Sequence, residues 1–485
     1  MRSVIVIGAG ISGLTAAWAL RDTARVTVLD SAPRVGGKIR TGRVAGVPVD
    51  LGAESMVAMG PDAVRLAEAV GLGDALCEPA AAPITIWTRD ALRPMPPGHL
   101  MGIPSRPELM ARSGLLSDEG LNRLHLGEDL EPLPPTTDVT VGGYLEPLIG
   151  REAVDRLVAP VLGGIYGGDA YRLSLASALP FLTGITESGE PLMTALRRRE
   201  SARAGAPRTS PVRGVRGGMG RLAQAVAESS GATVLTGTTA RAVCQEAETR
   251  AQADAKAKAD GAWRVHADTD DGPLALDADA VILAVPSDVA ARLLGPHAPH
   301  AAKALAEVEH ASSAVVTLAF PADGATREVF AGRNGFLVPP VDGRAVKGAT
   351  FLSAKWPWYV QDAPGVFIVR ASLGRAGADS PLGVPDRTLA DAALSDLTAA
   401  LGPLDEPVAS RVTRWERGLP QYHVGHGARM DLVRDELASL PGLDVCGATY
   451  RGVGVASCIS SGLAVARRMA PETEPFTRQE PADEQ

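Results

Sequence analysis

The sequence predicts an α/β protein built on a Rossmann-type domain, with a mixed α+β second domain and a helical insertion. Three observations predict this fold class. The β-branched run Val4–Ile7 leads directly into a glycine-rich turn. An alanine-rich helical segment, Leu14–Leu20, follows, and a second strand-like run, Val26–Leu29, comes after it. The chain has 485 residues, which suffices for two or three domains with sizeable cores.

The composition is that of an ordinary globular protein. Hydrophobic residues make up 45% of the chain and charged residues 21%, and the net charge is -8. Because binding to nucleic acid requires clustered positive charge, we expect no nucleic-acid partner. The four cysteines are scattered without a CxxC pair, so neither a disulfide framework nor a zinc site is predicted, and a reducing compartment is favoured.

The stretch Ser3–Leu20 carries no charge and follows Arg2, a pattern that it shares with signal peptides. Glycines interrupt this stretch at a fixed spacing, and no other run approaches the length that a membrane span requires. We therefore expect a cytoplasmic protein whose contact with membranes is at most peripheral.

The glycine-rich turn has the spacing GxGxxG, with Gly8, Gly10 and Gly13. In a strand–turn–helix unit the first glycine permits the tight turn, the second lets the backbone approach a pyrophosphate, and the third lets helix and strand pack closely. Asp30 follows Gly13 by 17 positions, at the end of the second strand. Its carboxylate can bind a ribose diol and would repel a 2′-phosphate. The unit therefore predicts a dinucleotide site and disfavours NADP.

The residues after Asp30 distinguish FAD from NAD. A second glycine pair, Gly36 and Gly37, allows another backbone segment to lie near the dinucleotide. Arg34 and Lys38 add positive charge beside the diphosphate. This continuation favours FAD, and a solvated turn is the alternative interpretation.

Three segments resemble the flavin-containing amine oxidase superfamily. The glycine-rich N-terminus is the first, and Val49–Ser55, which that superfamily places beside the flavin, is the second. The third is Gly447–Gly462, a glycine turn that precedes an alanine-rich helical stretch. The N-terminus of such a helix can stabilise the negative charge that a reduced flavin develops at its pyrimidine edge.

Further segments resemble the protoporphyrinogen and coproporphyrinogen III oxidase family within that superfamily. They are Leu162–Asp169, Leu419–His426 and Tyr450–Gly454, and the matches extend from near residue 1 to near residue 469. The resemblance assigns Val243 and Trp415 to the FAD contacts given below. The alternative interpretation is core packing for Val243 and an anchor between domains for Trp415. The resemblance implies FAD contacts at Gly8, Ala9, Gly10, Ile11, Ser12, Gly13, Asp30, Ser31, Lys38, Gly52, Ala53, Glu54, Ser55, Val243, Trp415, Val453, Gly454 and Val455.

The resemblance also implies a substrate pocket that includes Ile165, Tyr166, Lys355 and Trp356, although a structural role is as good an interpretation for each. In monoamine oxidases a cysteine near the C-terminal motif is linked to the flavin. This chain has Ala448–Arg451 at the corresponding place, so we expect non-covalent FAD.

No signature of a catalytic nucleophile, acid or base stands out. GxSxG is absent, and no Cys/His pair suggests a nucleophile with its base. His423 and His426 have a spacing that occurs in metal sites, but without a nearby carboxylate a structural role is favoured and no metal is expected. The catalytic residues stay unassigned, and the chemistry is expected to be that of the cofactor.

The family resemblance implies an activity. It is the FAD-dependent oxidation of coproporphyrinogen III to coproporphyrin III in heme biosynthesis, with oxygen as acceptor, six electrons removed in three flavin cycles and hydrogen peroxide released. A low aromatic content, 4%, and the lack of a membrane span favour coproporphyrinogen, with its four propionates. Protoporphyrinogen IX oxidase, an amine or polyene oxidase and a non-catalytic flavin-binding protein are the alternatives. A transient contact with a downstream metal-inserting enzyme is a further expectation.

The fingerprint at one end of the chain and the flavin-edge turn at the other must meet on one cofactor. We therefore expect a discontinuous FAD-binding domain, with a mostly helical insertion, a substrate-binding domain and a tail. The tail has five acids and one arginine and is expected to be disordered. The expected boundaries are 1–80, 210–295 and 440–470 for the FAD-binding domain, 81–209 for the insertion, 296–439 for the substrate-binding domain and 471–485 for the tail.

Overall fold

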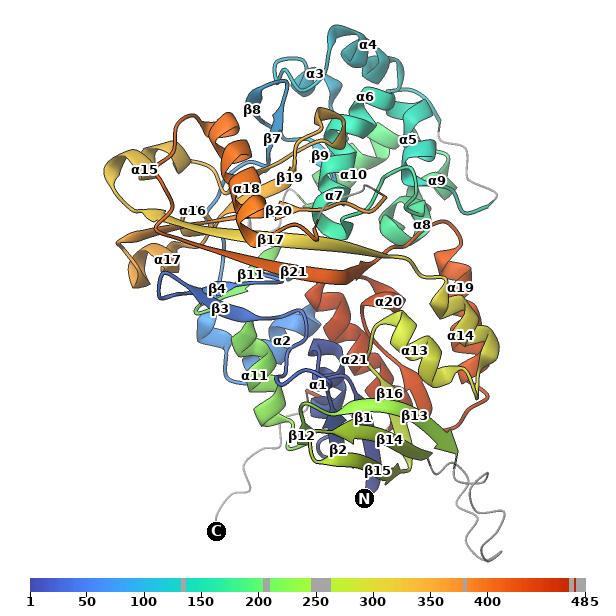
Figure 1. The fold of residues 1–485 in the computed structure, drawn as a ribbon. Helices are drawn as coiled ribbons and strands as arrows, with labels where there is room; N and C mark the ends of the chain where they lie inside the picture. Colours follow the sequence, from blue (N-terminus) through green and yellow to red (C-terminus); the bar gives the residue numbers. More distant parts are fainter. Residues whose placement is uncertain (132–136, 204–209, 246–262, 378–381, 471–474, 477–485) are drawn as a thin grey trace, which may run out of the picture.

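The computed structural model describes residues 1–131, 137–203, 210–245, 263–377, 382–470 and 475–476. The chain forms two parts, one above the other in Figure 1. The N-terminus lies in the lower part, which is organised around a parallel sheet. A pair of long strands crosses the middle of the molecule and forms the floor of the upper part.

The parallel sheet has five strands in the order β12-β2-β1-β16-β22, so segments from both ends and the middle of the chain meet in it. Strand β1 lies at the centre because four consecutive residues at its end are buried, as in a strand with both faces covered. Val4 pairs with Val26 on one side and with Ala280 on the other. The bounds are β1 (Arg2–Ile7), β2 (Ala24–Leu29), β12 (Thr233–Leu235), β16 (Ala280–Leu283) and β22 (Leu443–Val445).

One face of this sheet is covered by four helices that share a single hydrophobic core. Helix α1 is buried along its whole length because it lies between the sheet and the other helices. Gly462, in α21, lets that helix approach α1 so closely that a Cβ there would overlap the carbonyl of Ser12. Phe476, in the tail, packs against Trp18 of α1 with ring centroids 5.6 Å apart, whereas most of the tail lies outside the described residues. The four helices are α1 (Ile11–Ala19), α2 (Pro61–Ala69), α11 (Gly220–Ser229) and α21 (Val455–Met469).

The other face is covered by an antiparallel sheet of three strands and by three helices. Helices α14 and α19 come from the segment 296–439, which the sequence suggested for substrate binding. Both nevertheless share the hydrophobic core of the parallel sheet, because Leu305, Met430 and Val433 pack there with Ile5 and Ile7. The bounds are β13 (Thr239–Gln245), β14 (Trp263–Thr269), β15 (Gly272–Ala278), α13 (Ser287–Leu294), α14 (Pro299–Ala306) and α19 (His426–Leu437).

The upper part contains a sheet of seven strands in the order β21-β17-β20-β19-β18-β7-β8. All pairs are antiparallel except β18 with β7. Strands β7 and β8 lie in the expected helical insertion, but all four residues of β7 are buried and extend the sheet. The bounds are β7 (Thr85–Thr88), β8 (Ala91–Pro94), β17 (His310–Pro321), β18 (Gly335–Leu337), β19 (Val346–Phe351), β20 (Val366–Leu373), β21 (Ala409–Pro420) and α18 (Asp386–Leu401), which packs on this sheet.

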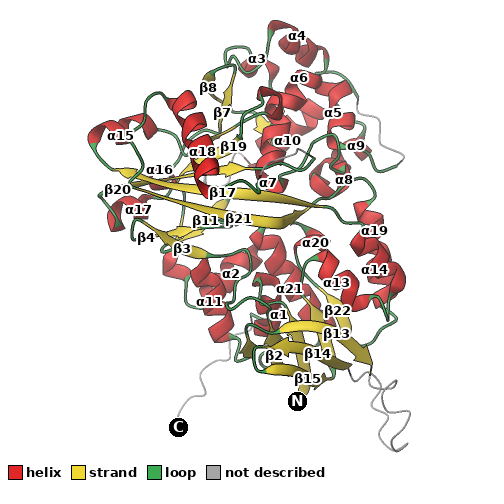
Figure 2. Cartoon of the chain, viewed as in Figure 1, coloured by secondary structure: helices red, strands yellow, loops and turns green. Residues whose placement is uncertain are grey.

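Apart from a short two-stranded sheet at residues 99–104, the regular elements in the rest of the insertion are helices, and they lie beside the seven-stranded sheet in Figure 2. Helix α7 contacts β19 and β18, so it packs on the seven-stranded sheet. The helices are α3 (Pro107–Met110), α4 (Asp118–Leu126), α5 (Val141–Ile149), α6 (Arg151–Ala153), α7 (Ala159–Tyr166), α8 (Leu175–Ala178), α9 (Thr183–Ser188) and α10 (Leu192–Arg203), with a π-helical turn at Val154–Val158.

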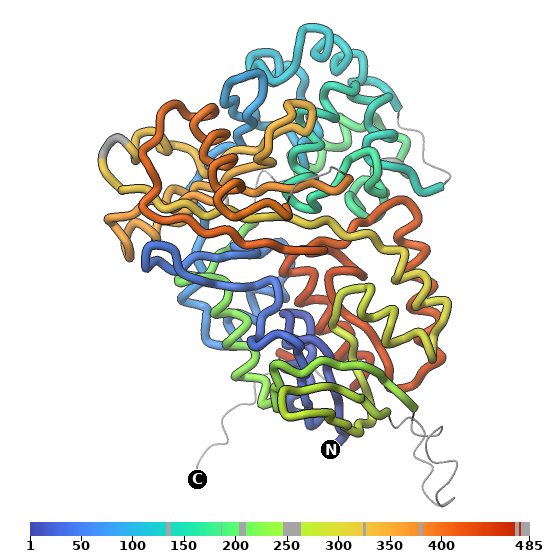
Figure 3. Tube along the Cα trace, viewed as in Figure 1, coloured from blue at the N-terminus to red at the C-terminus, as the bar shows by residue number. Residues whose placement is uncertain are grey.

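Short elements connect the two parts, and the hairpin of β3 and β4 lies against the long strands in Figure 3. In the described residues no helix is both long and apolar enough to span a membrane. The α/β fold class with a Rossmann-type parallel sheet is confirmed. The short elements are β3 (Thr41–Val44), β4 (Val47–Asp50), β5 (Met56–Val57), β6 (Leu76–Cys77), β9 (His99–Leu100), β10 (Ile103–Pro104), β11 (Val212–Val215), α15 (Gly324–Phe330), α16 (Leu352–Lys355), α17 (Pro357–Asp362), α20 (Ala448–Arg451) and the 3-10 turns Gly73–Ala75, Pro180–Leu182 and Pro340–Asp342.

Candidate functional site

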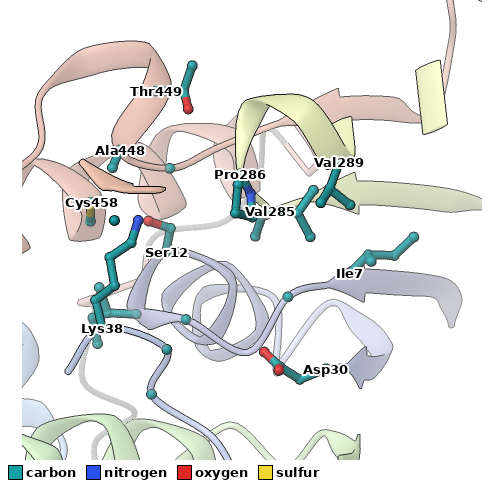
Figure 4. A pocket seen from close by; sticks show the side chains of 18 of the residues that line it. Ile7, Ser12, Asp30, Lys38, Val285, Pro286, Val289, Ala448, Thr449 and Cys458 are labelled. Atoms are coloured by element: carbon teal, nitrogen blue, oxygen red, sulfur yellow. The ribbon is translucent and has the colours of Figure 1, made fainter. Parts of the chain in front are cut away.

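A cavity of about 340 Å³ lies at the carboxyl end of β1, a size within the range of small-molecule sites. Its walls come from segments far apart in the chain, and the carboxyl end of a parallel sheet is where such folds bind ligands. In Figure 4, Asp30, Ile7 and Val289 surround one end, and Lys38, Ala448 and Cys458 the other. The lining segments lie within 7–12, 29–39, 238–240, 284–292, 418–420 and 447–458, with single contributions from Ala53 and His310.

The three glycines of the turn have different roles. Gly8 has a φ of +112°, and a Cβ there would overlap the carbonyl of Ala284. A Cβ on Gly13 would overlap the carbonyl of Gly8. Gly10 lines the cavity, and a Cβ there would have no atom within 4 Å. Gly8 and Gly13 are therefore required by the fold, whereas Gly10 leaves a space that a ligand can occupy.

Two helices begin at this cavity without a side-chain cap. Helix α1 starts after Gly10 and α21 after Gly454, and neither N-terminus has a side-chain hydrogen bond to its free N–H groups. Uncapped N–H groups and the positive end of the helix dipole favour an anion. A flavin dinucleotide suits both helices, because its anionic diphosphate can lie at α1 and the flavin edge, which becomes negative on reduction, can lie at α21.

Asp30 holds the glycine turn in place. Its Oδ2 accepts a hydrogen bond from the N–H of Ala9 at 2.7 Å, and its Oδ1 accepts one from the N–H of Ala32 at 2.8 Å. A carboxylate has about four acceptor sites, so lone pairs remain for the hydroxyls of a ribose. Asp30 therefore fits the ribose site that the sequence predicts while it also fixes the loop.

Lys38 lies in the cavity, and its side chain points toward Ser12 and Cys458 in Figure 4. Burial lowers the pKa of Lys38, and no carboxylate in the described part of the chain pairs with it. A cation that faces the cavity without a carboxylate partner fits an anionic ligand. Burial also raises the pKa of Cys458, which keeps its sulfur in the thiol form.

The segment Gly52–Glu54 is clamped by the upper part of the molecule. Glu54 accepts hydrogen bonds from Lys355 Nζ at 2.5 Å and from an Arg370 Nη at 2.9 Å. The other Nη of Arg370 donates to the carbonyl of Gly52 at 2.8 Å, and Trp415 Nε1 donates to the carbonyl of Leu51 at 2.8 Å. Burial opposes ionisation of Glu54, but the charges of Lys355 and Arg370 outweigh it and lower the pKa of Glu54.

The structure brings together more than half of the predicted cofactor residues. Of the others, Ala9 donates its N–H to Asp30. Gly52 and Glu54 belong to the clamped segment around Ala53, Ser55 follows that segment, and Trp415 donates to Leu51 just before it. The predicted residues that line the cavity are Gly8, Gly10, Ile11, Ser12, Asp30, Ser31, Lys38, Ala53, Val453 and Val455; those that do not are Ala9, Gly13, Gly52, Glu54, Ser55, Val243, Trp415 and Gly454.

Val243 lies away from the cavity. Its side chain is 2% exposed in the hydrophobic core, and its carbonyl faces His297 Nε2 at 2.6 Å. Strand β13 reaches the cavity only at its beginning, through Thr239 and Ala240. A bulge after Ala240 and the packing of Val243 against Trp263 explain why the contact lies three residues earlier than expected.

The four residues expected in a substrate pocket are not gathered at one place. Tyr166 is buried and donates its hydroxyl to the carbonyl of Ala178, and burial raises its pKa to about 12. Its neighbour Ile165 is 40% exposed. Trp356 is buried over Gly214, and Lys355 pairs with Glu54. None of the four lines the cavity.

Sequence reasoning missed His310 and Arg292. His310 lines the cavity, and its Nδ1 lies 3.0 Å from the carbonyl of Val308. Because a carbonyl only accepts, Nδ1 carries the proton and Nε2 of the neutral ring is an acceptor; burial lowers the pKa of His310. Arg292 donates to the carbonyls of Ala240 and Arg241. Neither residue stands in a motif that would have identified it.

His426 has a structural role. Its Nε2 lies 2.9 Å from the carbonyl of Thr449, and its ring stacks on Tyr422 at 4.1 Å. Burial lowers the pKa of His426 to about 4, so the ring is neutral and donates this hydrogen bond. Tyr422 also donates to the carbonyl of Ala448, so Tyr422 and His426 together fix the position of α20. The described residues contain no group of three potential metal ligands.

This fold and this cavity are those of the class of dinucleotide-dependent oxidoreductases. The chain belongs to the family of flavin containing amine oxidoreductases, whose model matches residues 11–470, and its cofactor is a flavin, FAD. It is 30% identical to the "Coproporphyrinogen III oxidase" of Bacillus subtilis over 96% of this chain and 97% of that protein. It is 33% identical to the protein of the same name from Mycobacterium bovis, over 95% of each chain. A crystal structure from Exiguobacterium sp. 255-15 superposes with a TM-score of 0.82 at 29% identity, over 96% of this chain and 98% of that one. The resemblance identified in the sequence is confirmed.

Proposed function

We propose that this protein oxidises coproporphyrinogen III to coproporphyrin III, with FAD as cofactor and oxygen as electron acceptor. Removal of six electrons and six protons from the macrocycle reduces three molecules of oxygen to three of hydrogen peroxide. The observation that carries the proposal is the nearly complete overlap with relatives of that name, over 95% or more of each chain, combined with one cavity at which two uncapped helices begin.

Several groups of this chain fit FAD. The backbone at Gly10 leaves space for the diphosphate, and the N–H groups of α1 and the ammonium of Lys38 supply positive charge there. Asp30 accepts from a ribose hydroxyl. When bound, the flavin supplies the acceptor for a hydride equivalent from a bridging carbon of the substrate and passes electrons on to oxygen.

The other end of the cavity has groups that suit the reacting ring. The N-terminus of α21 stabilises negative charge, and Leu419 and Pro420 are apolar walls that exclude water. His310 has an acceptor nitrogen and can take up a proton that a pyrrole N–H releases. We propose that FAD is bound non-covalently, because Ala448–Arg451 contains no thiol and Cys458 is held as a thiol.

The test compares coproporphyrinogen III and protoporphyrinogen IX with purified, FAD-loaded protein in air. Porphyrin fluorescence, oxygen consumption and peroxide are measured against controls without protein. We expect faster turnover of coproporphyrinogen III and one peroxide for each two electrons removed. A preference for protoporphyrinogen IX would overturn the proposed substrate. If both porphyrinogens are oxidised only at the rate of the controls without protein, the proposed activity is contradicted, and amines and polyenes are the substrates to test next. Release of the flavin on denaturation tests the non-covalent attachment.

A further inference from the structure

Lys347 lies on β19, in the interior of the upper part, and is 7% exposed. Burial, and after it the charge of Arg375, lower the pKa of Lys347 to about 8. In the described part of the chain no carboxylate forms an ion pair with its ammonium group. A buried ammonium without a counter-charge is costly, so its presence calls for a partner that the chain itself does not supply.

The ammonium group lies next to the wall of the cofactor cavity. Lys347 Nζ is 3.5 Å from the position that a Cβ on Gly167 would take, at the end of α7. The same position is 3.4 Å from Leu419 Cδ1 and 3.6 Å from Ala311 Cβ. Leu419 lines the cavity, and His310, the neighbour of Ala311, lines it as well. Gly167 has no side chain, so the space beside Nζ is left free.

Arg375 adds a second positive charge to this region. Its guanidinium donates to the carbonyls of Val338 and Arg344 at 3.0 and 3.3 Å. Asp396 raises the pKa of Arg375, although burial lowers it more, and one oxygen of Asp396 accepts from the N–H of Val346. The neighbourhood of Lys347 therefore carries more positive than negative charge, which favours an incoming anion.

The other described lysines have different surroundings. Lys355 pairs with Glu54, Lys303 is exposed on α14, and Lys38 lies within the cavity where the diphosphate of FAD fits. Lys347 is thus the buried lysine of the described residues whose charge neither an acid of the chain nor the proposed FAD diphosphate explains.

We propose that Lys347 binds a carboxylate of the substrate and holds one acidic side chain of the macrocycle beside the end of α7. This inference rests on the proposed function and deepens it, because it names a residue that recognises the propionate groups. A charge-assisted hydrogen bond in a desolvated site is among the stronger polar contacts, so its loss should be measurable in binding.

The experiment measures equilibrium binding of coproporphyrin III and of its tetramethyl ester to the FAD-loaded protein, followed by porphyrin fluorescence. Lys347→Met removes the charge, Lys347→Arg keeps it, and Lys303→Met is the control for loss of an exposed charge. We expect Lys347→Met to weaken binding of the acid by about ten- to a hundredfold and to leave binding of the ester unchanged. The Arg variant restores most of the affinity, and FAD content is unchanged in all variants.

Equal affinity of Lys347→Met and wild type for the acid overturns the inference, as does an equal loss for acid and ester. Loss of FAD from the folded Met variant also overturns it, because the lysine then serves the cofactor. Should the Met variant not fold, the wild type alone still tests the idea, since equal binding of acid and ester contradicts it. If the wild type binds porphyrin but does not oxidise coproporphyrinogen III, the proposed function fails while the carboxylate contact stands. If it binds neither porphyrin, both fail.

Discussion

At the scale of single residues, chemical type alone did not reveal the role of a charged side chain. Lys355 was a candidate for substrate binding, yet its ammonium pairs with Glu54 and so holds the segment beside the cavity. Its partner lies 301 positions away in the chain, and no local pattern records such a pairing. The glycines differ, because the backbone conformation that each permits is a local property.

We predict that Gly10→Val folds but fails to retain FAD. A Cβ at this position has no protein atom within 4 Å, and the position faces the cavity, so the apoprotein should lose only about 1 kcal/mol of unfolding free energy. Flavin absorbance after purification and the unfolding midpoint of the apoprotein measure the two effects.

The matched variant Gly13→Val should instead lose about 3 kcal/mol or more, because its side chain overlaps the carbonyl of Gly8. A Gly10→Val protein that carries a full complement of FAD would show that the diphosphate lies elsewhere.

Asp50 should make stability depend on pH. It is 4% exposed, and burial raises its pKa to about 6 although Thr41 and the N–H of Met219 donate to it. Because the pKa is higher in the folded than in the unfolded state, the folded state holds the proton more tightly. The stabilisation that this provides is complete below about pH 4 and is lost as the pH rises through about 6.

In Asp50→Asn this group no longer titrates, while the acceptor oxygen remains. The unfolding free energy of the variant relative to wild type should therefore rise by about 1 kcal/mol between about pH 5 and about pH 7. Denaturant titrations of both proteins at each pH measure the difference, in which other titrating groups cancel. A difference that stays constant with pH would mean that Asp50 has an ordinary pKa.

At the scale of elements, the close contact between α1 and α21 supports the cofactor site. A Cβ on Gly462 of α21 would overlap the carbonyl of Ser12 in the first turn of α1 and lie 3.0 Å from the Cβ of Thr15. Separating the two helices shifts the N–H groups that face the cavity. We therefore predict that Gly462→Ala lowers the unfolding free energy by about 1 to 3 kcal/mol and also weakens FAD binding.

Gly184→Ala in α9 is the matched control. Its Cβ would have no atom within 4 Å, so the usual preference of helices for alanine should stabilise the protein by up to about 1 kcal/mol without affecting FAD. The same sign of effect in both variants would argue against the helix contact as the cause.

At the scale of the whole molecule, the cavity joins segments from the entire chain, so cofactor binding should stabilise them together. We predict that FAD slows amide hydrogen exchange in residues 8–13, 36–39, 284–286 and 448–455 at once, and leaves α4 unchanged. The unfolding midpoint should also rise with FAD concentration. At a free FAD concentration of a hundred times Kd, the unfolding free energy should be about 3 kcal/mol higher than without FAD. Protection confined to residues 8–13 would contradict a site shared by both ends of the chain.

The sequence by itself determined the parallel sheet, the open backbone position at Gly10 and the place of Asp30 beside the glycine turn. Each depends on local properties, namely the run of buried residues in a strand, the backbone freedom of glycine and the spacing along one strand–turn–helix unit. The tertiary structure decided that Ala240 rather than Val243 reaches the cavity and that α14 and α19 pack against the parallel sheet. It also decided that no carboxylate of the described residues forms an ion pair with Lys347. These features depend on which distant segments pack together. Long-range packing and ion pairing produce no periodic pattern in the sequence, so they could not be predicted from it.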